Sequence, residues 1–208
     1  MENKPVKSPA QNKPVAARRN KGEPRTQLDP ERWVETAIDL LAREGISGLR
    51  VEVLAKRCGV TKGSFYWHFK DRQALLDAVL ERWQAGRIRD IEKTTALIDV
   101  DRAREQLHYV IEVYGASRNR KGMSIELAVR DWARHDARAA AVVEEVDLYR
   151  LECTRKLFVA AGMSDAEAKS RSLLLYACVF GLSLMHYAHF DDNLADLKQR
   201  IAERIVSS

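Results

Sequence analysis

The segment from Val51 to Arg72 restricts the possible fold more than any other part of the sequence. It predicts two short helices joined by a tight turn, because Ala55 permits close helix contact and Gly59 can adopt a positive φ. Thr61 is a favourable N-cap for the second helix. The apolar side chains spaced to face inward are Leu54, Val60, Phe65 and Phe69. This pattern is typical of a helix-turn-helix, whose second helix fits the major groove of DNA.

The residues that follow the turn are more specific than its spacing. The run GVTKGSFYWHF at 59–69, followed by Lys-Asp-Arg and Ala-Leu-Leu, resembles the DNA-binding domain of the TetR family of transcriptional regulators. The specific residues lie between about Gly45 and Leu80, and the resemblance in layout starts near Pro30 and covers the rest of the chain. It implies three helices for DNA binding and six for sensing and dimerisation. The alternative is a helical hairpin with a purely structural role.

Composition and periodicity favour an all-α fold. Hydrophobic residues make up 46% and charged residues 31% of the 208, and there are five Pro and ten Gly. Alternating strand-like runs of useful length are absent from the sequence. We expect a tail at 1–27, a three-helix DNA-binding domain at 28–75, and a helical effector-binding and dimerisation domain at 76–208. Beyond the helix-turn-helix, helices are expected over residues 72–94, 101–117, 123–135, 136–161, 164–189 and 194–205, with a polar break at 118–122.

Positive charge is concentrated in the N-terminal part of the chain. Residues 1–75 contain 15 Lys+Arg and 9 Asp+Glu, a net charge of +6, whereas the remainder has 20 and 21, a net charge of −1. This asymmetry matches a domain that binds phosphates, although basic tails are common on soluble proteins. The tail is expected to be disordered. It is either a solvated segment or a basic arm that contacts phosphates or the minor groove.

The resemblance implies which residues contact double-stranded DNA. Lys62, Gly63 and Tyr66 occupy positions that reach base edges. Arg50 stands where many members of the family have Thr or Ser, and it could bind a phosphate or a base. The residues implied to contact phosphates, or to lie near them at helix ends, are Thr61, Ser64, Trp67, His68, Lys70 and Arg72. The helix N-terminus at Arg72 is also suited to a phosphate.

The resemblance also implies a homodimer and a small-molecule effector. Two recognition helices must lie roughly 34 Å apart to read a palindromic operator. The expected dimer seam consists of Leu173, Ala177, Phe180, Gly181 and Leu184; the alternative is that this helix is buried within its own subunit. The candidates for an effector pocket are Trp83, Tyr109, Val113, Trp132, Tyr149, Phe158, Tyr176 and His186. Residues of these types are more often ordinary core residues than ligand contacts.

Several other classes of protein are disfavoured by the sequence. Cys58, Cys153 and Cys178 have no metal-ligand spacing, so we expect free thiols, no metal and a cytoplasmic protein. Cys58 is expected to be structural, with a redox switch as the alternative. The apolar run at 173–190 contains Ser and His and is expected to be a buried helix rather than a membrane span. No catalytic motif or cofactor signature stands out, so an enzyme is disfavoured. A DNA-binding protein that recruits a protein partner without an effector is the remaining alternative.

Overall fold

The computed structural model describes residues 28–96, 100–115 and 120–207, and the predicted tail at 1–27 lies outside them. Within these ranges the chain forms nine α-helices, two short 3-10 helices (Ile46–Gly48 and Val100–Arg102) and no strand, which confirms the predicted all-α class. The α-helices are α1 (Pro30–Glu44), α2 (Val51–Arg57), α3 (Lys62–Phe65), α4 (Arg72–Thr95), α5 (Ala103–Gly115), α6 (Arg120–Ala133), α7 (Ala137–Ala160), α8 (Asp165–Leu184) and α9 (Leu194–Val206).

Local sequence signals account for most of the helix ends. The side chains of Asp29, Asp71 and Ser164 accept backbone N–H groups in the first turns of α1, α4 and α8, so each satisfies a donor that the helix leaves free. Gly45 follows α1 with a φ of 68°. Thr61 occupies the N-cap position of α3, but its side chain makes no capping hydrogen bond.

Two predicted helix boundaries are wrong. Helix α8 ends at Leu184 rather than near His189. The prediction relied on the continuous apolar character of the segment, but Met185 and Phe190 are exposed, so no packing within the chain extends the helix. Helix α6 begins at Arg120, inside the predicted polar break. Charged residues do not prevent a helix, and Lys121 pairs with Asp39 of α1, 2.8 Å away.

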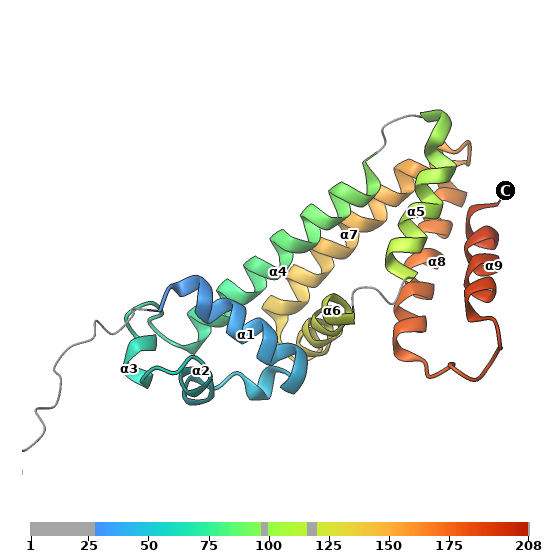
Figure 1. Ribbon diagram of the computed structural model, residues 1–208. Helices are drawn as coiled ribbons and strands as arrows, with labels where there is room; N and C mark the ends of the chain where they lie inside the picture. Colours follow the sequence, from blue (N-terminus) through green and yellow to red (C-terminus); the bar gives the residue numbers. More distant parts are fainter. Residues whose placement is uncertain (1–27, 97–99, 116–119, 208) are drawn as a thin grey trace, which may run out of the picture.

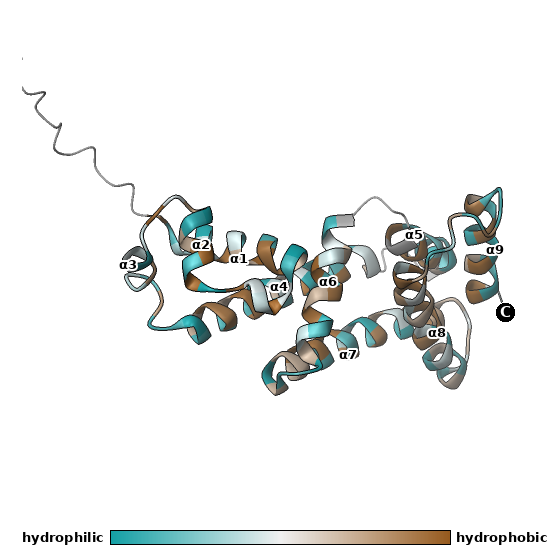
Figure 2. Ribbon diagram, turned by 90° about the horizontal axis from the view of Figure 1, so that it is seen from below, coloured by the Kyte–Doolittle hydropathy of each residue, from teal (hydrophilic) through white to brown (hydrophobic). Residues whose placement is uncertain are grey.

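The helices form an elongated arrangement with the helix-turn-helix at one end (Figure 1). Helices α1, α2 and α3 lie at this end, and α4 leads out of it and packs along α7. Helices α5, α8 and α9 lie at the other end. Helix α6 packs against both α1 and α7. Figure 2 shows hydrophobic and hydrophilic residues alternating along α4 and α9, as expected of helices with one buried face.

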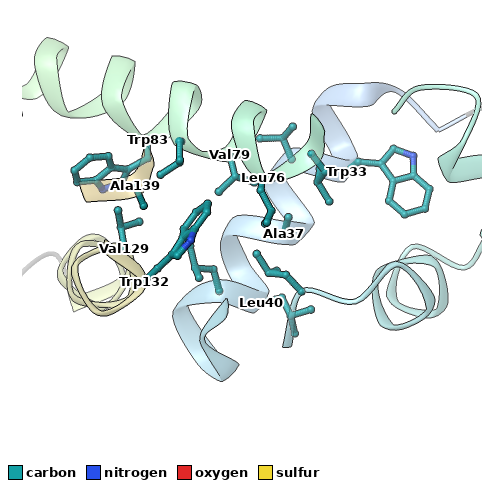
Figure 3. Close-up of a cluster of buried hydrophobic side chains, with 14 of the residues drawn as sticks. Trp33, Ala37, Leu40, Leu76, Val79, Trp83, Val129, Trp132 and Ala139 are labelled. Carbon is teal, nitrogen blue, oxygen red and sulfur yellow. The ribbon is translucent and has the colours of Figure 1, made fainter. Parts of the chain in front are cut away.

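Two hydrophobic clusters stabilise the described part of the chain. The first includes Trp33, Phe65 and Leu76, and it continues into α6 through Val129 and Trp132 and into α7 through Ala139 (Figure 3). This cluster is therefore continuous across residue 75, where we predicted the DNA-binding domain to end. The second joins α5, α7, α8 and α9, and its largest buried side chains include Leu107, Leu157, Phe158, Leu175 and Tyr176.

Candidate nucleic-acid interface

The short helix α3 is held in place by aromatic packing. Phe65 is fully buried, its ring meeting the Trp33 ring of α1 edge-on at a centroid distance of 5.4 Å. It also stacks with Phe69 at 5.4 Å. Aromatic pairs in these geometries add stability beyond the area they bury. Because one side of α3 is fixed against α1, its opposite side faces outward.

The turn between α2 and α3 has the geometry that its residues predict. Gly59 has a φ of 68°, a conformation that costs glycine little. The backbone N–H of Val60 donates to the carbonyl oxygen of Ala55 at 3.0 Å and closes the turn. Cys58 is half-buried, with its Sγ 3.5 Å from the Thr36 hydroxyl of α1. This environment is compatible with the structural role predicted for Cys58.

The outward face of α3 is made mostly of the predicted contact residues. Lys62, Gly63 and Tyr66 are exposed, and 79% of the Trp67 surface is accessible. A Cβ added at Gly63 would meet only the Thr61 hydroxyl, at 3.8 Å, so packing within the protein does not require glycine there. The open surface at this position leaves room for a ligand to approach the backbone.

The other predicted DNA contacts differ in their accessibility. Thr61, Lys70 and Arg50 are exposed, whereas Ser64 and His68 are half-buried. The Nε2 atom of His68 is shielded from solvent and has no hydrogen-bond partner among the described residues. This atom is therefore less available to a phosphate than the sequence pattern suggested.

Arg72 makes contacts that the sequence pattern did not predict. Its Nε donates to the Leu49 carbonyl oxygen at 2.6 Å, and a terminal nitrogen donates to the Ile46 carbonyl oxygen at 3.1 Å. These hydrogen bonds tie the first turn of α4 to the link between α1 and α2. Arg72 thus has a structural role in the free protein, which differs from the phosphate contact implied by the resemblance.

The acidic residue Glu52 lies beside α3. Glu52, in the first turn of α2, accepts a hydrogen bond from Lys62 with an Nζ–Oε1 distance of 2.5 Å. This bond lowers the pKa of the Glu52 carboxyl and raises the pKa of the Lys62 amine. Sequence reasoning missed the pair, because its members belong to different helices and meet only when the turn has formed.

The eight candidates for an effector pocket do not gather in one place. Trp83 and Trp132 are buried in the first hydrophobic cluster, and Tyr149 is partly buried against it. Phe158 and Tyr176 belong to the second cluster. The remaining three, which are exposed, are Tyr109, Val113 and His186.

A buried ionic network that we did not predict connects α6 and α7. Arg130 forms a bidentate pair with Asp147, with N–O distances of 2.8 and 2.6 Å, and also donates to Glu126. Arg150 donates to the same Glu126 oxygen at 3.1 Å. The side chains of Glu126 and Arg150 are each only 4% exposed, so these charges are compensated by one another rather than by water.

The network also reaches α8 through aromatic rings. The Arg130 guanidinium lies 4.0 Å from the centre of the Phe180 ring, and Arg150 lies 5.4 Å from the rings of both Tyr176 and Phe180. Burial would lower the pKa of Arg130, but its hydrogen bonds and charge interactions with Asp147 and Glu126 raise that pKa above its usual value. Three helices therefore meet at one charged cluster.

The predicted dimer residues lie on α8, and most are accessible. Leu173 and Leu184 are 61% and 63% exposed, and Ala177 is also exposed. Phe180 and Gly181 are half-buried, and a Cβ added at Gly181 would meet no atom within 4 Å. This side of α8 therefore presents apolar side chains and small residues at its surface rather than inside its own chain.

Within the described residues, no group of three or more His, Cys, Asp or Glu side chains is placed to hold a metal ion. No helix in the described ranges is both long and apolar enough to cross a bilayer.

Sequence comparisons place the helix-turn-helix in a known family. Residues 34–79 match the model of bacterial regulatory proteins of the tetR family. The chain is 45% identical over 56 residues to the class A tetracycline repressor from transposon 1721 of Escherichia coli, covering 27% of this chain and 26% of the repressor. It is 35% identical over 65 residues to the regulator AcrR of Shigella flexneri, covering 31% and 29% of the two chains. The matches thus span about a quarter of the length of these relatives.

Solved structures with the same fold cover most of the chain. A candidate transcriptional regulator from Saccharomonospora viridis, crystallised with choline, matches with a TM-score of 0.70 at 18% identity, covering 85% of this chain and 94% of that one. The regulator FadR of Bacillus halodurans matches with a TM-score of 0.60 at 15% identity, covering 91% and 98%. These likenesses show a shared fold. The match at residues 34–79 shows that this part of the chain is a DNA-binding domain of the tetR family of bacterial regulatory proteins.

Proposed function

We propose that this protein is a cytoplasmic homodimeric transcriptional repressor that binds a palindromic DNA operator and is released by a small-molecule effector. The observation that carries the proposal is the outward side of α3 and of the turn at 66–68 that follows it, where Lys62, Tyr66 and Trp67 are exposed while Phe65 anchors the helix. Side chains of these types suit base edges and phosphates in the major groove. The relatives compared above are named as repressors or regulators, not as enzymes.

The exposed side of α8 supports the proposed dimer. Apolar side chains at an accessible helix surface favour association with a partner, and small residues such as Ala177 and Gly181 permit close approach. One helix-turn-helix gives few base contacts, whereas two copies related by a twofold axis read both halves of a palindrome.

Two observations support release by an effector. The choline complex of the Saccharomonospora viridis protein shows that a related fold holds a small molecule. In our chain, α4 connects the helix-turn-helix to the rest of the protein and packs along α7. A displacement of α7 by a bound ligand would therefore shift α4 and, with it, the position of α3. The test is to measure operator affinity with and without compounds that bind the protein; unchanged affinity for all of them would contradict effector control.

A DNA-binding protein that recruits a protein partner is a second candidate. The scatter of the predicted effector residues over two clusters favours it, as do the exposed side chains of Met185 and Phe190 after α8. In that case no small molecule would change operator affinity, whereas a partner protein would bind the segment that follows α8.

Replacing Lys62 or Tyr66 by alanine should weaken binding to the cognate operator by about 1–3 kcal/mol, because each change removes a base or phosphate contact. The operator is first selected from random duplex DNA, and affinities are then measured by fluorescence anisotropy over a salt series. Binding of the unaltered protein should weaken steeply with salt, since Lys and Arg displace counterions. The dimer should remain intact. Unaltered affinity in both variants would show that α3 is not the recognition helix.

Replacing Ala177 by arginine should disrupt the proposed dimer. The change places a long charged side chain where two α8 helices would approach each other, and burying it there without a partner is costly. Sedimentation should show a shift from twice the chain mass of 23.7 kDa towards a single chain mass. The matched control is Ala141→Arg, at an exposed position of α7. If Ala177→Arg stayed dimeric like the control, the dimer surface would lie elsewhere.

A further inference from the structure

Glu52 is unusual in its surroundings. Between Arg50 and Lys70 the sequence contains five basic residues and Glu52 as its single acidic residue. Its side chain is 63% exposed and that of its partner Lys62 is 52% exposed, so neither is needed to fill the protein core. A carboxylate that faces DNA is repelled by the phosphates unless it finds a donor. Its presence on this face therefore requires a reason other than packing.

The pair places a donor and an acceptor side by side. The Lys62 amine and the Glu52 carboxylate are 2.5 Å apart, and they come from the first turns of α3 and α2, respectively. The major-groove edge of a G·C pair has the complementary pattern: guanine offers the N7 and O6 acceptors, and cytosine offers the N4 amino donor. At an A·T pair the same groups occur in a different order, with an adenine amino group and a thymine carbonyl.

We propose that Glu52 and Lys62 together form a specificity-determining pair that reads one G·C base pair in each operator half-site. Lys62 donates to guanine, and Glu52 accepts from the amino group of cytosine. Where an A·T pair replaces the G·C pair with adenine in place of guanine, the thymine carbonyl occupies the position of the cytosine amino group, so the carboxylate faces an acceptor and opposes binding. Glu52 thus weakens binding to wrong sequences more than to the right one. The inference rests on the proposed DNA-binding function, and it adds which base pair the protein selects.

The test compares the unaltered full-length protein with Glu52→Gln, which removes the charge but keeps the size of the side chain. Three kinds of duplex are used: the operator selected by the unaltered protein, a series of operators in which each G·C pair is replaced in turn by A·T, and an unrelated duplex. In the unaltered protein, one G·C replacement should cost about tenfold or more in affinity. In Glu52→Gln that penalty should fall to about threefold or less, and affinity for the unrelated duplex should rise by about threefold to tenfold.

The matched control is Glu105→Gln on α5, which also removes the charge of an ion-paired glutamate but lies at the opposite end of the molecule (Figure 1). It should leave all three affinities unchanged. If Glu52→Gln strengthened binding to every duplex by the same factor, Glu52 would act only as an electrostatic brake and base reading would be overturned. If it matched Glu105→Gln, the inference would also be overturned. Absence of any duplex binding by the unaltered protein would instead contradict the proposed function itself.

Discussion

Replacing Glu126 by alanine should lower the free energy of unfolding by about 3–5 kcal/mol, the usual cost of leaving buried charges without a partner. One oxygen of Glu126 accepts hydrogen bonds from both Arg130 and Arg150. Without it, the one carboxylate among the described residues that still pairs with the Arg150 guanidinium, whose side chain is 4% exposed, is Asp147, with an N–O separation of 3.4 Å. Urea unfolding followed by circular dichroism measures the change.

Two further variants separate the contribution of the ionic network to stability from the effect of removing one negative charge. Glu126→Gln keeps an acceptor oxygen near Arg150 and should therefore cost less than Glu126→Ala. Glu144→Ala removes a charge from an exposed position of α7 and should change stability by less than about 0.5 kcal/mol. If Glu126→Ala cost no more than Glu144→Ala, the network would contribute nothing to the stability of the fold.

The ionic network around Glu126 is one feature of the structure that could not be predicted from the sequence. Glu126 and Arg130 are four residues apart in one helix, a spacing typical of exposed ion pairs on a helix surface. Their burial depends on the packing of α6 against α7 and of α7 against α8. No feature of the neighbouring sequence encodes that packing, so the buried ionic cluster could not be predicted from the sequence.

The helix-turn-helix, by contrast, could be predicted because it depends on local features of the sequence. Its determinants are close together in sequence: the φ of Gly59, the buried Phe65 and the cap at Asp71 each act within a few residues. Arg72 shows where this local reasoning ends. Its hydrogen bonds reach back to the carbonyl oxygens of Leu49 and Ile46, more than twenty residues earlier, and the sequence pattern implied only a phosphate contact.

The four tryptophans provide a matched test of both the fold and the interface. Three are nearly or fully buried, whereas Trp67, in the turn that follows α3, is 79% exposed. Trp132 extends from α6 into the cluster that contains Ala37 and Leu40 of α1 (Figure 3). The same substitution at Trp132 and Trp67 should therefore affect different properties of the protein.

Replacing Trp132 by alanine should cost about 3–5 kcal/mol of unfolding free energy, because it removes a large buried ring and leaves a cavity between α6 and α1. It also removes the hydrogen bond of this side chain to Asp136, the N-cap of α7. Trp67→Ala should change stability by less than about 0.5 kcal/mol yet weaken operator binding. Urea unfolding and anisotropy titration of the same two variants measure both quantities. If Trp67→Ala left operator affinity unchanged, its exposed ring would have no part in DNA binding. If Trp132→Ala were as stable as Trp67→Ala, the contact of α6 with α1 would not stabilise the fold, and α4 would be left as the main connection between the helix-turn-helix and the rest of the chain.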